Sequence, residues 1–211
     1  AGKRGVSWAV AHGCTDAVEY LGNLGITPDN EYTYYSVIRA CQRGDMKSIK
    51  LLRERGHWGS NDINNLLRTA AYNGQLEVIK YFLELGGKID NYCVYHAMIV
   101  GSYETVAYLL SIPRSNYVHF NLDIIRAASI LSAHRGHIGV IEALMDANVY
   151  IYNDAVTYAA EAGHVDIVRS VATRQRFRAR GIGIVINVRR VHKLRRLLQF
   201  EAEGVVRIIW K

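Results

Sequence analysis

A small residue followed four positions later by glycine recurs six times along the chain, and this repeat constrains the possible folds more than any other feature. The glycines are Gly13, Gly44, Gly74, Gly101, Gly136 and Gly163. The small residues that precede them are Ala9, Ala40, Ala70, Ala97, Ser132 and Ala159. Successive glycines are 27 to 35 residues apart. A period of this length is typical of solenoid proteins, in which every copy is one supersecondary unit.

Two apolar positions follow each glycine at constant offsets. Five residues after it stands a β-branched residue, in chain order Val18, Ile49, Ile79, Val106, Ile141 and Val168. Eight residues after it stands a second apolar residue, in chain order Leu21, Leu52, Phe82, Leu109, Leu144 and Val171. Residues three or four apart lie on the same face of a helix, so both positions predict the buried face of one helix.

A helix terminator stands twelve residues after four of the six glycines: Gly25, Gly56, Gly86 and Asn148. Gly and Asn tolerate the left-handed backbone that closes a helix, and Pro113 and Gln175 occupy the other two places. Each copy therefore predicts a short helix ending at the glycine motif, a tight turn, a second helix of about ten residues and a loop. One such pair cannot bury its apolar face alone, so the copies must stack into an all-α solenoid over residues 1–173.

Two segments resemble the Ala-Ala-x-x-Gly-His-x-x-Val-Val core of ankyrin repeats. They are residues 159–168, Ala-Ala-Glu-Ala-Gly-His-Val-Asp-Ile-Val, and residues 73–82, Asn-Gly-Gln-Leu-Glu-Val-Ile-Lys-Tyr-Phe. The resemblance covers roughly residues 5–175, although the Thr-Pro-Leu-His opening of the family is absent. Short repeats of this kind are similar to the divergent ankyrin proteins of giant DNA viruses. The resemblance implies about six ankyrin-like repeats that serve as a non-catalytic binding module without cofactors.

The positive charge of the chain is concentrated at its C-terminal end. The formal net charge is +7. Residues 174–211 hold eleven Lys or Arg residues against Glu201 and Glu203, whereas residues 1–173 hold fifteen basic and seventeen acidic residues. We therefore predict two parts, a nearly neutral repeat array at residues 1–173 and an Arg-rich C-terminal cap or tail at residues 174–211.

Apolar stretches and cysteines indicate the compartment. No apolar stretch approaches the roughly eighteen residues that span a bilayer, and no hydrophobic run follows the N-terminal Ala-Gly-Lys-Arg. Cys14, Cys41 and Cys93 are an odd number within apolar helical patterns, which favours buried thiols in a reducing compartment over disulfides. We expect an intracellular protein, in the cytoplasm or nucleus, with no membrane span.

The sequence gives no sign of catalysis or of a metal site. It contains no nucleophile-elbow pattern and no phosphate-binding glycine loop. His134 and His137 stand three residues apart, but no cysteine or carboxylate cluster completes a zinc set. His164 follows its turn glycine as His137 does, which favours a structural role for both. We expect no enzyme activity, no cofactor, no metal and no small-molecule substrate.

The concave surface of a solenoid, formed by loops and first helices, aligns equivalent positions of successive repeats into rows. Fourteen tyrosines are available for such a surface, and tyrosine suits interfaces because it combines a large ring with a polar hydroxyl. We predict a macromolecular partner, in the first place a protein, contacted by Gln42, Arg43, Tyr72, Asn73, Tyr92, His134, Arg135, Tyr150 and Tyr152. For any one tyrosine the alternative is packing across a repeat junction. Residues 113–121 lengthen one repeat and are either a partner-contacting finger or a tolerated extension.

The tail leaves three interpretations open. Its arginines suit phosphate contacts: Arg174, Arg176, Arg178, Arg180, Arg189, Arg190, Arg195 and Arg196. Val191, Leu194, Leu197 and Leu198 have the spacing of an amphipathic helix, which would suit the capping repeat of a solenoid. The tail is thus a cap, a nucleic-acid contact, or a contact with a membrane surface or acidic protein. The main hypothesis is a protein–protein interaction scaffold. The alternative is a structural component of a nucleoprotein or virion assembly, anchored through the tail to nucleic acid or an acidic surface.

Overall fold

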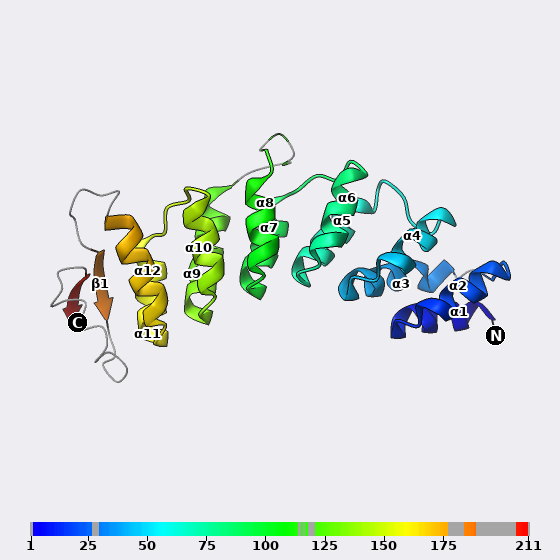
Figure 1. Ribbon diagram of the computed structural model, residues 1–211, viewed down its shortest axis with the longest axis horizontal. Helices are drawn as coiled ribbons and strands as arrows, with labels where there is room; N and C mark the ends of the chain where they lie inside the picture. Colours follow the sequence, from blue (N-terminus) through cyan, green and yellow to red (C-terminus); the bar gives the residue numbers. More distant parts are fainter. Residues whose placement is uncertain are drawn as a thin grey trace. The chain divides into compact units, whose positions relative to one another are not determined.

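The computed structural model describes residues 2–26, 30–113, 115, 117, 121–176, 184–188 and 206–210. In this part of the chain the helices form six consecutive pairs (Figure 1). The pairs are α1 (Gly2–His12) with α2 (Thr15–Asn23), α3 (Asn30–Arg43) with α4 (Met46–Glu54), α5 (Ile63–Tyr72) with α6 (Leu76–Glu84), α7 (Asn91–Val100) with α8 (Tyr103–Ser111), α9 (Leu122–Arg135) with α10 (Ile138–Asp146), and α11 (Asn153–Ala162) with α12 (Val165–Arg176). None of the helices in these described ranges is long and apolar enough to cross a membrane.

The chain divides into two compact units, and the division falls within α7. Unit 1 holds residues 1–96 and 115–118, and unit 2 holds residues 97–114 and 119–211. Within unit 1, α1 packs against α3, α3 against α5, and α2 against α4. Within unit 2, α9 packs against α11, while α8 and α12 both pack against α10. First helices thus stack on first helices and second helices on second helices, which confirms the predicted ankyrin-like stacking of helix-turn-helix repeats.

The six motif glycines close the first helices in the same way. Their φ angles lie between 67° and 89°, a left-handed conformation that favours glycine. In every copy the backbone N–H of the residue after the glycine donates to the carbonyl of the small residue, at 2.8 to 3.1 Å. This bond satisfies a carbonyl that the helix end would otherwise leave without a partner. The predicted tight turn is therefore present six times.

The second helices end at the predicted terminators. Gly25, Gly56, Gly86 and Asn148 have φ angles between 60° and 88°. In the fourth copy, α8 ends at Ser111 and Ile112 is extended, with φ −73° and ψ 139°. The residue before a proline is disfavoured in helical conformation, so Pro113 explains this end. At the sixth place Gln175 lies inside α12, which continues to Arg176.

The core is built from the recurring positions. The small residues and the β-branched residues of all six copies are at most 2 % exposed. The second apolar position is buried in five copies, and Leu21 is half-buried. The small residue on each first helix leaves room for close approach of the neighbouring first helix. In unit 2 the Ser132 hydroxyl even donates to the carbonyl of Met98, at 2.8 Å.

The prediction of buried thiols holds for two of the three cysteines. Cys41 and Cys93 are buried, and burial raises the pKa of the Cys41 thiol to about 12. Cys14 is exposed, so the prediction is wrong there. Cys14 follows the turn glycine Gly13 and stands at the N-cap of α2, outside the apolar face of either helix.

The tail contains strands that the sequence analysis did not predict. β1 (Ile184–Val188) and β2 (Val206–Trp210) pair in parallel, with Ile184 opposite Val206 and Val188 opposite Trp210. Both strands are rich in β-branched residues, a signal that the tail's arginine pattern overshadowed. β1 packs against α11, the first helix of the last repeat. The amphipathic helix expected around Val191–Leu198 lies outside the described residues.

Candidate partner-binding surfaces

The nine predicted contact residues are divided between the two units. Unit 1 holds Gln42, Arg43, Tyr72, Asn73 and Tyr92, and unit 2 holds His134, Arg135, Tyr150 and Tyr152. The four tyrosines are exposed, between 40 % and 57 %. Arg43, His134 and Arg135 are also exposed, whereas Gln42 and Asn73 are half-buried.

Arg43 and Arg135 serve the fold directly. The guanidinium group of Arg43 donates to the carbonyl of Ala11, at 2.5 Å, and to that of Val10. The guanidinium group of Arg135 donates to the carbonyl of Ile99, at 2.6 Å. Each arginine thereby satisfies carbonyls at the C-terminal end of the preceding first helix. A partner would find much of their hydrogen-bonding capacity already used.

The residue after the turn glycine extends this pattern. Nε2 of Gln75 donates to the carbonyl of Gln42, at 3.1 Å, and Nε2 of His164 lies 3.0 Å from the carbonyl oxygen of His134. A Cβ atom added at Gly101 would overlap the ring of His137, and one at Gly136 would overlap that of His164. These contacts give both histidines the structural role predicted for them. Burial, followed by the charge of Arg135, lowers the pKa of His137.

Aromatic and basic side chains gather on the exposed sides of the first helices in unit 1. We call this surface the unit 1 face and define it by Arg4, Trp8, Tyr35, Arg39, Tyr72 and Tyr92. Arg4, Tyr35 and Tyr92 stand nine positions before their turn glycines, and Trp8 and Arg39 stand five positions before theirs. The four rings are between 52 % and 60 % exposed. The repeat thus places five of the six side chains at equivalent positions of α1, α3 and α7, and Tyr72, two positions before Gly74, extends the face onto α5.

On α1 and α3, members of the unit 1 face contact neighbouring side chains of their own helix. The Trp8 ring stacks on that of His12, with centroids 4.1 Å apart. Nη2 of Arg39 donates to the hydroxyl of Tyr35, at 2.6 Å, and its guanidinium carbon lies 5.0 Å from the ring centroid. Nη1 of Arg39 donates to Oε1 of Gln42, at 3.2 Å. Among the side chains that the structure describes, no carboxylate pairs with Arg39.

A cluster around His96 forms the other end of the unit 1 face. The rings of Tyr72, Tyr92 and Tyr95 lie 5.2, 6.3 and 5.5 Å from that of His96. Tyr72 comes from α5 and the others from α7, so the cluster joins neighbouring repeats. Burial lowers the pKa of His96, which favours the neutral ring at physiological pH.

Asp90 immediately precedes α7 and contacts residues next to the cluster. Its carboxylate pairs with the guanidinium of Arg68 and accepts the backbone N–H of Cys93, at 3.0 Å. Burial raises the pKa of Asp90, but the hydrogen bonds from Arg68 and Cys93 outweigh it, so the pKa lies below its usual value. Arg68 also stands over the ring of Tyr92, at 5.6 Å.

Unit 2 contains a pocket of about 290 Å³ between α9 and the loop that joins α10 to α11. Its lining consists of Leu122, Ile125, Arg126, Ser129, Ala147, Asn148, Val149, Tyr150 and Tyr152. Arg126 stands 4.4 Å over the ring of Tyr152 and pairs with Asp154 at 2.8 Å. Tyr150 and Tyr152 were predicted contact residues, whereas Leu122 and Arg126 were not. Arg126 and Asp154 are 28 residues apart, close to the repeat period, and this spacing could have indicated an ion pair between neighbouring repeats.

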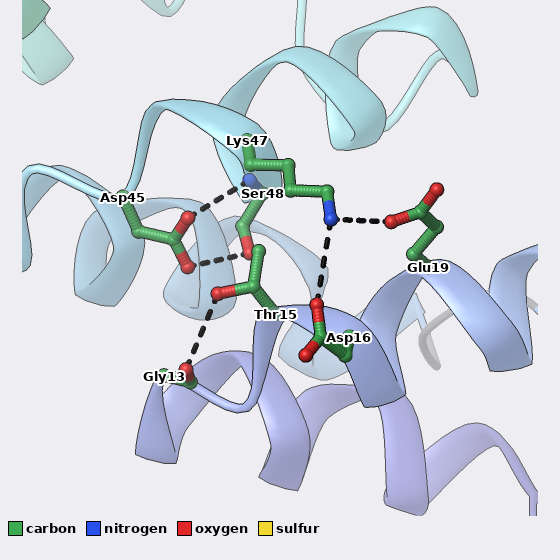
Figure 2. Close-up of polar contacts among 7 residues, drawn as sticks. All are labelled: Gly13, Thr15, Asp16, Glu19, Asp45, Lys47 and Ser48. Atoms are coloured by element: carbon green, nitrogen blue, oxygen red, sulfur yellow. Dashed lines mark hydrogen bonds and ion pairs between the residues drawn. The ribbon is translucent and has the colours of Figure 1, made fainter.

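Some second helices differ from the unit 1 face because they carry cations that pair with carboxylates of a neighbouring second helix. Figure 2 shows Lys47 of α4 reaching Glu19 and Asp16 of α2, at 2.5 and 3.4 Å. These carboxylates raise the pKa of Lys47. In the same view Asp45 accepts the backbone N–H of Ser48 and caps α4. The charge of Lys47 is thus compensated by two carboxylates of the preceding repeat.

Of the predicted phosphate-binding arginines, Arg174 is the one whose side chain the structure describes. Its guanidinium group lies 2.6 Å from Asp146 and 3.8 Å from Glu142, so two carboxylates of α10 compensate its charge. The backbone of Arg176 ends α12. Arg178, Arg180, Arg189, Arg190, Arg195 and Arg196 lie outside the described residues. The described part of the chain contains no group of three or more His, Cys, Asp or Glu side chains that could hold a metal.

Comparison with known proteins supports the ankyrin resemblance. The chain is 24 % identical over 155 residues to the "Putative ankyrin repeat protein R837" of Acanthamoeba polyphaga mimivirus. The match covers 72 % of this chain and 24 % of that protein, so the chain spans about a quarter of its length. No protein-family model matches the chain. The repeat pattern, the helix pairs and this similarity are all consistent with ankyrin-like stacked repeats.

Proposed function

We propose that the protein is a non-catalytic scaffold that holds a protein partner on the first-helix side of its repeats. The observation that carries the proposal is the unit 1 face, whose four aromatic rings are more than half exposed. These rings lie on the side opposite to the apolar positions that stack the repeats. Exposed, aligned aromatic side chains are typical of interaction surfaces. The similarity to a viral ankyrin repeat protein supports a binding role of this general kind.

The predicted contact residues take different parts in this proposal. Tyr72 and Tyr92 belong to the unit 1 face, and Tyr150 and Tyr152 line the pocket of unit 2. Arg43 and Arg135 hold neighbouring helices together, so we assign them to the scaffold rather than to the contact. Gln42 supports the surface through its amide, which accepts from Arg39.

The proposal is tested by capture of partner proteins from the cells in which the protein is made. The test variant carries Tyr35→Ala, Tyr72→Ala and Tyr92→Ala. Tyr35→Ala should alter the free energy of unfolding by less than about 0.5 kcal/mol. Tyr72→Ala and Tyr92→Ala remove ring contacts with His96 and should each cost about 0.5 to 1.5 kcal/mol, so circular dichroism is used to check that the variant is folded. Proteins captured by the wild type should be lost from the variant, as identified by mass spectrometry.

The control variant removes two exposed tyrosines from second helices, with Tyr20→Ala on α2 and Tyr103→Ala on α8. These side chains are 66 % and 49 % exposed. The control should capture the same proteins as the wild type. Equal capture by the wild type and by the triple variant would overturn the assignment of the binding surface.

A further inference from the structure

We infer that the unit 1 face binds an acidic segment of its partner, a stretch of polypeptide in which carboxylates stand beside apolar or aromatic side chains. The inference rests on the proposed function and adds the chemistry of the partner. It is drawn from the charges and rings that the structure places on α1, α3, α5 and α7.

Positive charge is concentrated on the first helices of unit 1. Residues 1–96 hold eleven basic and ten acidic residues, so this stretch is nearly neutral. The helices α1, α3, α5 and α7 nevertheless carry five basic residues, Lys3, Arg4, Arg39, Arg43 and Arg68, against one acidic residue, Glu31. The remaining acidic residues stand in second helices and loops. Such separation creates a surface potential that attracts carboxylates.

The cations on the first helices of unit 1 differ in how far neighbouring carboxylates compensate their charge. Arg68 pairs with Asp90. Arg43 donates to neutral carbonyls and keeps its full charge. Arg39 donates to the hydroxyl of Tyr35 and the amide of Gln42, which are also neutral. By contrast, Lys47 on α4 and Arg174 on α12 each have two carboxylates beside them. Arg39 therefore presents a fixed, uncompensated guanidinium group in the middle of the face.

The rings on either side of Arg39 determine the rest of the partner's chemistry. Trp8, Tyr35, Tyr72 and Tyr92 offer apolar surface, and the tyrosine hydroxyls add hydrogen-bond donors. A carboxylate at Arg39 leaves its neighbouring side chains over these rings. Apolar or aromatic side chains are favoured there because they exclude water from the ion pair. A purely charged segment would leave the rings uncovered.

A nucleic-acid strand fits this surface less well than an acidic peptide. Strand binding needs a run of phosphate contacts from several cations. Of the cations on these helices, Arg43 is held by carbonyls of α1 and Arg68 is paired with Asp90, whose carboxylate lies at the ring cluster, which leaves Lys3, Arg4 and Arg39 for such contacts. A protein segment with few, spaced carboxylates matches that arrangement.

The test is a selection of random peptides on the full-length protein by display, followed by affinity measurement. Pools are sorted for binding to the wild type and against binding to the Arg39→Gln variant. We expect the surviving peptides to be enriched in Asp and Glu next to aromatic or aliphatic residues. Fluorescence anisotropy of a surviving peptide should show roughly fivefold weaker binding to Arg39→Gln, the effect of one exposed ion pair.

The Lys50→Gln variant is the matched control, because it removes one positive charge from an exposed position on the second helix α4. It should bind the peptide as the wild type does. Failure to obtain peptides, peptides without an acidic bias, or equal losses in both variants would overturn the inference. Tighter binding of a single-stranded oligothymidine than of the peptide at physiological salt, lost in Arg39→Gln, would assign the face to nucleic acid instead. If the inference fails while the triple tyrosine variant still loses captured proteins, the proposed function stands. If the triple tyrosine variant captures the same proteins as the wild type, both the proposed function and the inference are overturned.

Discussion

At the scale of single residues, the turn glycines are required for a left-handed backbone and for lack of space beside the turn, and the sequence indicates only the first of these. Their recurrence predicts a left-handed backbone, and all six adopt it. The structure adds that the space beside some of them is filled by a side chain of the following repeat. Gly101 lies against His137, whereas Gly86, the glycine that ends the second helix α6, has open space where a Cβ would stand. The difference follows the position of the glycine in the repeat, but the sequence does not show that a side chain of the following repeat fills the space at the first-helix turn.

Alanine substitutions should separate the two requirements. Gly86 and Gly101 have nearly the same φ, 88° and 84°. Gly86→Ala should cost only the left-handed backbone strain of about 1 kcal/mol. Gly101→Ala should cost about twice as much, since the added Cβ also displaces the His137 ring. Urea denaturation measures both values, and equal losses would show that the histidine contact contributes nothing.

Asp90 should make the free energy of unfolding of unit 1 decrease at acidic pH. Its pKa is lower in the folded chain than the ordinary value of 3.8, so its carboxylate stabilises the fold above that value. The contribution is lost as the pH falls through the lowered folded pKa. Asp90→Ala, which also removes the cap of α7, should cost about 1 to 2 kcal/mol at pH 7.

Asp90→Asn is the informative comparison, because asparagine caps a helix about as well as aspartate does. It should lose less stability than the alanine variant at neutral pH. Below the ordinary aspartate pKa its stability should fall less with acid than that of the wild type. Urea midpoints followed from pH 7 to acid test this, and parallel curves for wild type and Asp90→Asn would count against the ion pair with Arg68.

At the scale of elements, three first helices depend on a side chain of the next repeat to complete their C-terminal ends. Arg43 does this for α1, Gln75 for α3 and Arg135 for α7. The sequence predicted the helices and their ends from periodicity and terminators, but it assigned Arg43 and Arg135 to a partner. Position relative to the glycine showed that these arginines lie at the helix end. It could not show that their side chains turn back onto the preceding helix.

Arg135→Gln tests the structural assignment. Removing the guanidinium leaves the carbonyl of Ile99 without its charged donor, and a hydrogen bond of this kind contributes about 1 kcal/mol or somewhat more. Thermal and urea unfolding should show that loss. Arg39→Gln is the comparison, because the partners of Arg39 are exposed side chains on its own helix, and its effect should stay within about 0.5 kcal/mol. If both variants changed the free energy of unfolding by the same small amount, Arg135 would not have a structural role and would again be a candidate contact residue.

At the scale of the whole molecule, the fold was more predictable than the surface. A six-copy pattern with fixed offsets determines the helices, the turns and the buried positions, because stacking repeats the same contacts. The pocket of unit 2 and the cluster around His96 each join side chains from different repeats, and a one-dimensional period carries little information about such junctions. The strands of the tail were missed for another reason. The repeat pattern stops before them, and their arginine-rich surroundings suggested a helix or an arm.

The contact between β1 and α11 leads to a prediction about the last repeat. A solenoid loses stability from an uncovered end, and β1 packs against α11 on unit 2. A chain ending at residue 176 should therefore expose amides of α11 and α12 to faster hydrogen exchange, by roughly tenfold for each 1.4 kcal/mol of lost local stability. Amides of α3 and α5 in unit 1 provide the internal control and should exchange at unchanged rates. Unchanged protection of α11 would mean that residues 177–211 do not cap the array. The arginines of the tail would then be the place to look for a second binding activity.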